Sequence, residues 1–135
     1  MHIDDVTGRI VSAAIRVHSR IGPGLLESSY EACLRYELLK SGLQVASQVP
    51  VPLVYDDVKL DIGYRIDLLV ENEVVFEIKA LESTLPVHEA QLLFHMRLSG
   101  RRVGFLMNFH VKLMKNGIKR MVDRFPAGGF QCRSN

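Results

Sequence analysis

The fold is decided by the stretch YRIDLLV-ENE-VVFEIK, residues 64–79. Two apolar runs of β type flank the polar break at residues 71–73, which is typical of a β-hairpin. Because side chains alternate across a strand, Glu77 and Lys79 share one face and the apolar side chains of that strand occupy the other. Asp67 joins the face of Glu77 if the register of the two strands allows it. The stretch therefore predicts a hairpin with charged side chains on one face.

Such a charged face has two interpretations. An Asp, a Glu and a Lys on adjacent strands are costly to bury without a counter-ion, and two convergent carboxylates supply the oxygen ligands that Mg²⁺ prefers. In the other interpretation Glu77 and Lys79 form an ordinary solvated ion pair near a strand end, since E-x-K triplets are common. The position of the triplet inside a run of Val, Phe and Ile favours the metal site, but these residues alone leave both interpretations open.

The 135-residue chain is long enough for one domain with a core of its own. It has two cysteines, Cys33 in a predicted helix and Cys132 near the end, and neither has the spacing of a zinc ligand set. No apolar run reaches the length of a membrane span, and the start lacks a secretory pattern. We therefore expect a cytoplasmic protein with no membrane partner.

Charge is distributed unevenly along the chain. Residues 1–90 hold 8 Lys and Arg against 14 Asp and Glu, whereas residues 91–135 hold 9 against 1, and the net charge is +2. A basic region beside an acidic metal pocket suits a phosphodiester substrate, because cations hold the backbone while a metal ion serves the chemistry. A solvated basic face is the alternative, so this asymmetry favours nucleic acid only weakly.

Hydrophobic periodicity and turn signals predict an α/β (α+β) domain with a mixed sheet flanked by helices. The expected element order is α-α-β-β-β-α-β(-β), with the domain over residues 1–124 and a flexible tail over 125–135. Pro50 and Pro52 indicate that the first strand is an edge strand or contains a bulge. The expected elements are helices over 4–20, 25–40 and 86–98, and strands over 44–55, 59–70, 74–80, 101–108 and 118–122.

Two of these helices place polar side chains on one face. Helical spacing brings Glu27 and Glu31 to the side of the second helix that also carries Tyr30. In isolation Glu27 is best explained as a first-turn glutamate that interacts favourably with the helix dipole. On the third helix His88, Gln91 and His95 share one face.

Several segments, in this order, resemble the GxxExxY protein family of the PD-(D/E)XK nuclease-like superfamily. The resemblance spans residues 4–123 and implies a restriction-endonuclease-like core, a mixed sheet flanked by helices. The segments that carry it are Gly24-Leu25-Leu26-Glu27-Ser28-Ser29-Tyr30, Gly63-Tyr64-Arg65-Ile66-Asp67, Glu77-Ile78-Lys79, Pro86-Val87-His88-Glu89-Ala90-Gln91-Leu92-Leu93 and Asn108-Phe109.

The resemblance also implies a role for each matching residue. Asp67 would bridge to the metal ion, with Glu77 as the second ligand and the carbonyl of Ile78 completing the coordination. Lys79 would orient or activate the attacking water. Two further side chains would reach the same site from helices: Glu27 through a metal-bound water, and Gln91 to orient water or phosphate. The implied catalytic set is Glu27, Asp67, Glu77, Lys79 and Gln91.

The chain departs from the family pattern at His95, where members commonly carry Tyr one turn after the glutamine. A histidine can hydrogen-bond or titrate where a phenol does not, so the substrate end of the pocket is expected to differ, unless the change only affects packing. The residues predicted to contact substrate are Tyr30, His95, Arg97, Arg101 and Arg102.

Two functions follow from this pattern. The first is a Mg²⁺-dependent endo- or exonuclease, with Mn²⁺ as a substitute, that hydrolyses nucleic acid, DNA rather than RNA. The second is a nuclease-fold module that binds nucleic acid or a protein without cutting. The complete set of carboxylates facing one lysine favours the first, whereas the small size and the lack of a helix-turn-helix pattern favour the second. A homodimer would give so small a core a longer groove.

Overall fold

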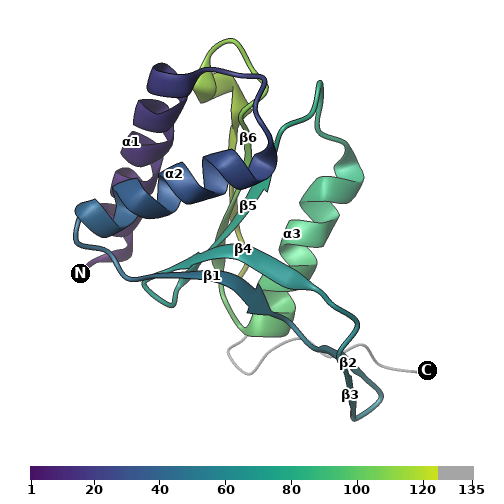
Figure 1. The fold of residues 1–135 in the computed structure, drawn as a ribbon. Helices are drawn as coiled ribbons and strands as arrows, with labels where there is room; N and C mark the ends of the chain where they lie inside the picture. Colours follow the sequence, from purple (N-terminus) through teal and green to yellow (C-terminus); the bar gives the residue numbers. More distant parts are fainter. Residues whose placement is uncertain (125–135) are drawn as a thin grey trace.

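The computed structural model describes residues 1–124, so the predicted tail over 125–135 lies outside the described residues. Within them, three α-helices surround a mixed sheet (Figure 1). None of these helices is long and apolar enough to cross a membrane. The elements are α1 (Ile3–Ile21), α2 (Glu27–Lys40), β1 (Val45–Pro50), β2 (Leu53–Tyr55), β3 (Val58–Leu60), β4 (Arg65–Val70), β5 (Val74–Lys79), α3 (Pro86–Ser99), β6 (Val103–Asn108), the 3-10 helix η1 (Met114–Gly117) and β7 (Ile118–Val122).

The main sheet has five strands in the order β1-β4-β5-β6-β7. The predicted hairpin is confirmed: β4 and β5 are antiparallel, with Leu68 opposite Phe76 and Val70 opposite Val74. The β5–β6 pair is parallel and is connected through α3, whereas the other neighbours are antiparallel. The proline-containing β1 lies at one edge, as predicted, and β7 lies at the other.

The predicted strands over 44–55 and 59–70 are each interrupted, which corrects the expected order at this point. β2 and β3 form a separate two-stranded hairpin that projects from the main sheet (Figure 1). Pro52 has no N–H to donate to a ladder, and Gly63 adopts a left-handed conformation with φ of 85°. The connecting segments still meet, because Val51 N donates a hydrogen bond to Tyr64 O at 2.9 Å.

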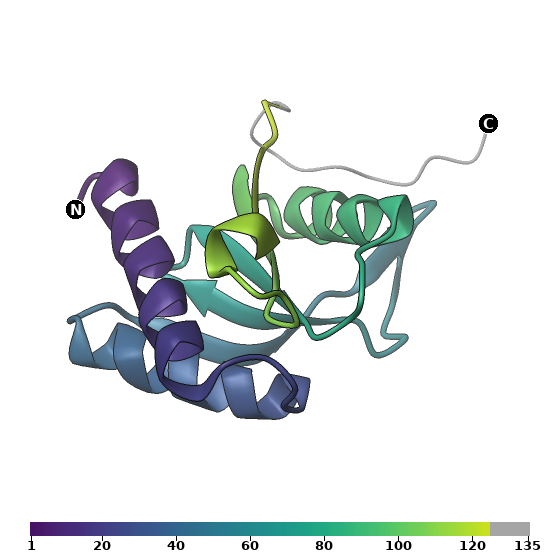
Figure 2. The ribbon, with the colours of Figure 1, turned by 90° about the horizontal axis from the view of Figure 1, so that it is seen from above.

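Helices cover both faces of the main sheet (Figure 2), with α1 and α2 on one face and α3 on the other. The α1–α2 side holds the larger apolar cluster, in which Phe76 and Ile78 of β5 are almost fully buried. Tyr30 of α2 belongs to this cluster and stacks on Phe109 with ring centroids 4.5 Å apart. This side of the sheet is a closed core.

The α3 side holds a smaller apolar cluster that includes Leu92 and Met96. Gly104 of β6 allows close packing here, since a Cβ at that position would lie 2.6 Å from the Met96 sulfur. Asn108, at the end of β6, fixes the loop that leads from β5 to α3: its side-chain amide donates to Leu81 O at 2.8 Å and its Oδ1 accepts from Leu81 N at 3.0 Å. These contacts tie the start of that loop to the end of β6.

Candidate functional site

The β4–β5 ladder opens next to Asp67. The last Cα pair in this direction is Leu68 with Phe76, so Asp67 and Glu77 are the next residues on their strands. There the Asp67 carboxylate accepts a hydrogen bond from Ile78 N at 2.7 Å, so a side chain replaces part of the backbone ladder. The register thus allows what the sequence left conditional: Asp67, Glu77 and Lys79 all line the same pocket.

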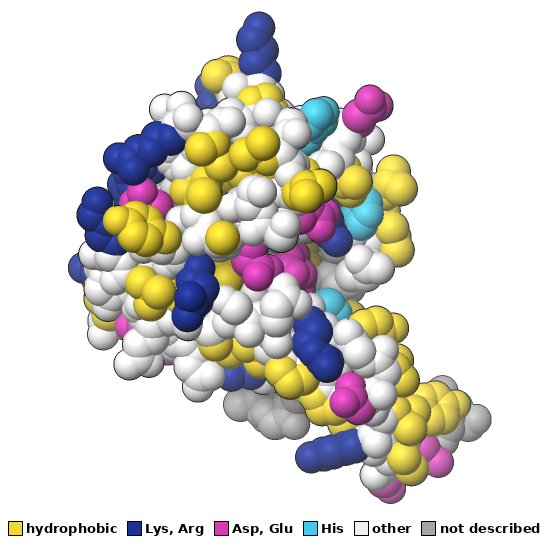
Figure 3. Space-filling view, viewed as in Figure 1, with side chains coloured by type: hydrophobic (Ala, Val, Ile, Leu, Met, Phe, Trp, Pro, Cys, Tyr) yellow, Lys and Arg dark blue, Asp and Glu magenta, His cyan; other side chains and the backbone are white. Residues whose placement is uncertain are grey.

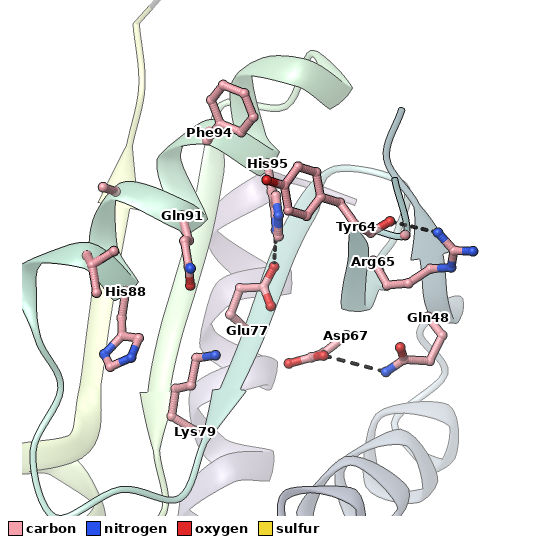
Figure 4. A pocket seen from close by; sticks show the side chains of 13 residues that line it. Gln48, Tyr64, Arg65, Asp67, Glu77, Lys79, His88, Gln91, Phe94 and His95 are labelled. Atoms are coloured by element: carbon pink, nitrogen blue, oxygen red, sulfur yellow. Dashed lines mark hydrogen bonds and ion pairs between the residues drawn. The ribbon is translucent and has the colours of Figure 1, made fainter. Parts of the chain in front are cut away.

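This pocket has a volume of about 600 Å³ and lies between the open end of β4–β5 and α3. Asp67, Glu77 and Lys79 point into it (Figure 4). In the space-filling view, acidic and histidine side chains gather in a hollow beside the projecting β2–β3 hairpin (Figure 3). The lining residues are Gln48, Gly63, Tyr64, Arg65, Asp67, Glu77, Lys79, Val87, His88, Ala90, Gln91, Phe94 and His95.

Glu77 is the most buried acidic residue of the pocket, with 7% of its surface exposed. Its Oε1 lies 2.6 Å from His95 Nδ1, and the His95 ring packs against Tyr64 at a centroid distance of 5.6 Å. Burial raises the pKa of Glu77, the hydrogen bond to His95 opposes that rise, and the negative charge of Asp67 adds to it. His95 therefore pairs with Glu77 at the wall of the pocket.

The predicted face of the third helix is confirmed, because His88, Gln91 and His95 all line the pocket. The three side chains differ in what holds them. His88 Nδ1 accepts from Leu85 N at 2.9 Å and so caps the start of α3. Gln91 is exposed at the pocket wall. Lys79 makes no ion pair within residues 1–124, which leaves its ammonium group available to a bound anion.

The structure does not bring Glu27 into this pocket. Glu27 is the exposed first residue of α2, whereas Glu31, one turn later, contacts the site. Gln48 Nε2 donates to Glu31 Oε1 at 2.6 Å and lies 3.5 Å from Asp67 Oδ1. Burial and the nearby Asp67 charge raise the pKa of Glu31, and the Gln48 hydrogen bond opposes the rise. Of Glu27 and Glu31, Glu31 is the one coupled to Asp67.

Tyr30 is likewise not at the pocket, contrary to its predicted contact with substrate. Its side chain is fully buried. The hydroxyl donates to Gly22 O at 2.6 Å and accepts from Leu25 N at 3.2 Å. In the GxxExxY-like segment, Tyr30 thus fastens the connection between α1 and α2, which is a structural role.

The three predicted arginines also lie away from the pocket. Arg97 Nε donates to Asp123 Oδ2 at 3.0 Å, and Arg101 donates to Ser99 O at 2.8 Å and to the backbone oxygen of Asn72. Arg101 and Arg102 immediately precede β6, beside the start of β5 rather than its end. Along five residues of strand this separates them from Lys79 by roughly 17 Å.

A family model described as the PD-(D/E)XK nuclease superfamily matches residues 4–121. The chain belongs to this superfamily. Neither a curated protein nor a solved structure matches it. The mixed sheet flanked by helices is consistent with the restriction-endonuclease-like core that the sequence predicts.

Nucleases of the PD-(D/E)XK superfamily generally use divalent metal ions. Within residues 1–124, no group of three or more His, Cys, Asp and Glu side chains is arranged to hold a metal ion. Two carboxylates, Asp67 and Glu77, do converge, and the negative charge of Asp67 raises the pKa of both Glu77 and Glu31. Mg²⁺ is usually held by one or two carboxylates, waters and substrate phosphates, and this donor set fits it.

Several residues that line the pocket had no role in the sequence-based prediction, among them Tyr64, Arg65 and Gln48. Tyr64 and Arg65 belong to the segment Gly63–Asp67, so the matching motif was a signal for them, although no role was assigned. Arg65 Nη1 donates to Tyr64 O at 2.9 Å. Gln48 lies in an edge strand, outside every matching segment, and no sequence signal pointed to it.

Proposed function

We propose that the protein is a Mg²⁺-dependent nuclease that hydrolyses phosphodiester bonds of nucleic acid, DNA in preference to RNA, with Mn²⁺ as a substitute ion. The observation that carries the proposal is the convergence of Asp67, Glu77 and Lys79 in one pocket at the open end of β4–β5. Membership of the PD-(D/E)XK superfamily supports the same chemistry. The homodimer expected from the small size of the chain stays a prediction.

Asp67 and Glu77 would hold the ion, with the Ile78 carbonyl as a further oxygen donor. A divalent ion at such a site supplies Lewis-acid chemistry, which polarises a phosphoryl oxygen and makes water a stronger nucleophile. The hydrogen bond from His95 occupies Glu77 Oε1 and leaves the second carboxylate oxygen for the ion.

The remaining pocket residues would act on the substrate. Lys79 has no ion pair within the described residues, and its ammonium group would orient the water or offset charge that develops on the phosphoryl oxygens. Gln91 would donate hydrogen bonds to water or phosphate from α3. Arg65, which lines the pocket where the predicted arginines do not, would hold the backbone of the nucleic acid.

One observation favours a second function, a module that binds without cutting. Within residues 1–124 the acidic side chains do not form a three-member metal cluster. A binding module has no need of such a cluster. The two functions differ in whether Asp67 is required for binding a cation.

The test is calorimetric titration of Mg²⁺ and Mn²⁺ into the chelator-treated chain, followed by cleavage assays on labelled single- and double-stranded DNA and RNA. Asp67→Asn should remove cation binding, and Asp67→Asn and Lys79→Ala should each lower cleavage by about 100-fold or more. Asp56→Asn and Lys59→Ala, in the exposed β2–β3 hairpin, are the matched controls and should change neither. Normal cleavage by both pocket variants would reject the assignment, and nucleic-acid binding without cation binding or cleavage would establish the module.

A further inference from the structure

Gln48 has an unusual backbone conformation for a strand residue. Its φ is 51°, in the left-handed region that is unfavourable for side chains other than glycine. The other non-glycine residues with positive φ among residues 1–124 are Asp56 and Asp57, in the β2–β3 turn, and Glu71 and Asn72, in the β4–β5 turn. Tight hairpin turns require such values. Gln48 is the one that lies inside a strand, and no turn explains it.

A β-bulge does not explain it either. On β1, Ser47 pairs with Leu68 and Val49 pairs with Ile66, so a single residue separates the paired positions on both strands. A bulge would insert an extra residue on one of them. Gln48 thus occupies the register position opposite Asp67, and the distortion is confined to that position.

The side chain of Gln48 contacts two acidic residues from different elements. Its Nε2 donates to Glu31 Oε1 of α2 at 2.6 Å and lies 3.5 Å from Asp67 Oδ1 of β4 (Figure 4 shows the Asp67 side). Asp67 Oδ2 is held separately by Ile78 N at 2.7 Å. One amide group therefore lies between two carboxylates at the wall of the pocket, and both oxygens of Asp67 have a donor nearby.

We propose that Gln48 is a positioning residue, whose side-chain amide links Glu31 to Asp67 and fixes the direction of the Asp67 carboxylate in the pocket. This inference rests on the proposed function, because it takes Asp67 as a cation ligand. Backbone strain is commonly retained where a site requires it, and the left-handed conformation lets an edge-strand side chain reach both α2 and the pocket. A partner that orients a ligand typically changes metal affinity by about 10- to 100-fold when it is removed.

Two substitutions distinguish the effect of the Gln48 side-chain amide from the effect of its strained backbone conformation. Gln48→Ala removes the amide and keeps the strain, whereas Gln48→Gly removes the amide and relieves the strain. We expect both to weaken Mn²⁺ and Mg²⁺ binding, measured by calorimetry on the full chain, by about tenfold or more. Gln48→Gly should also have a Tm about 2–4 °C above that of Gln48→Ala, in thermal unfolding without metal.

Each variant has a matched control. Gln44→Ala removes an exposed glutamine at the start of the same chain segment, and Asp57→Gly relieves a left-handed residue in the β2–β3 turn. Neither should change cation affinity, although Asp57→Gly should have a higher Tm than Asp57→Ala, as Gln48→Gly has a higher Tm than Gln48→Ala. A purely structural role for Gln48 would move the Tm and leave cation affinity alone.

The outcomes distinguish this inference from the proposed function. If the natural chain binds the cations, Asp67→Asn abolishes binding and both Gln48 variants bind as tightly as the natural chain, the positioning role is wrong and the proposed function stands. A Tm of Gln48→Gly at or below that of Gln48→Ala would contradict the assigned strain. If the natural chain binds neither cation at millimolar concentration, the proposed function fails and the positioning role fails with it.

Discussion

Glu37 and Glu77 are both buried glutamates, 5% and 7% exposed, but their surroundings differ in charge. Glu37 accepts from Arg16 Nε and from Arg20 Nη1, each at 2.9 Å, so two guanidinium groups of α1 face one carboxylate of α2. Glu77 meets one histidine at 2.6 Å, and the Asp67 charge nearby raises its pKa further after burial has raised it. The chain therefore pairs Glu37 with two cationic side chains and places Glu77 where the net effect of its surroundings disfavours the charged carboxylate.

This difference distinguishes a structural charge from a binding site. A buried ion is tolerated when its partners come from the same fold, and the Glu37 cluster joins two helices on the closed side of the sheet. Around Glu77 the sheet opens into a pocket, and Lys79 lowers the pKa of Glu77 less than His95 does. A cation bound from solution would compensate the charge of the Glu77 carboxylate, as Arg16 and Arg20 compensate the charge of the Glu37 carboxylate.

The largest effect on stability is expected for Glu37→Gln. The substitution leaves two arginines facing an uncharged amide, and breaking a buried ion pair costs about 3–5 kcal/mol. Arg16 and Arg20 are 39% and 62% exposed, so water screens part of that loss and we expect about 2 kcal/mol in urea unfolding. Glu73→Gln, an exposed control, should stay within about 0.5 kcal/mol. A loss no larger than that of the control would remove the contrast between the two glutamates.

The next effect has the opposite sign and concerns Glu77→Gln. A carboxyl group whose pKa is raised on folding binds its proton more tightly in the folded state than in the unfolded state, so its contribution to stability falls as the pH rises. We expect the natural chain to lose stability relative to Glu77→Gln from pH 4.5, the ordinary pKa of the group, up to the raised pKa of the folded state. Above that pH the stability difference between the two proteins should stay constant, and the variant should bind no cation.

Urea unfolding of both proteins at several pH values between 4 and 8, without metal, measures this difference. If the natural chain instead becomes more stable relative to the variant as the pH rises, the surroundings of Glu77 favour its charged form. Glu77 would then resemble Glu37, and the argument for an added cation would be lost.

The sequence predicted the strands that build the site better than the contacts around it. Alternation along β5 placed Glu77 and Lys79 on one face, and the four-residue spacing on α3 brought Gln91 and His95 to the same pocket. The placement of these side chains on one face was predictable because it depends only on local periodicity. Whether Asp67 lies on the same face as Glu77 depended on the register of the two strands, which the length of the β4–β5 turn determines.

Contacts between elements were not predictable in this way. Glu27 and Glu31 share one side of α2, and how the helix sits on the sheet decides which of them meets Asp67. The charge excess after residue 90 gave no position for Arg101, which the parallel β5–β6 register places at the other end of the strand. Gln48 gave no signal, because nothing in a glutamine predicts a left-handed backbone.

The smallest effect is expected for Tyr30→Phe, which compares the closed side of the sheet with the pocket. Tyr30 OH donates to Gly22 O and accepts from Leu25 N, so its loss should cost about 1 kcal/mol of stability. Cation affinity should not change, since Tyr30 is fully buried away from the pocket. Tyr64→Phe is the matched control: Tyr64 is 40% exposed at the pocket, and its substitution should leave stability within about 0.5 kcal/mol. If Tyr30→Phe instead weakened nucleic-acid binding at unchanged stability, Tyr30 would contact substrate as the sequence predicted. The binding site would then include this part of α2.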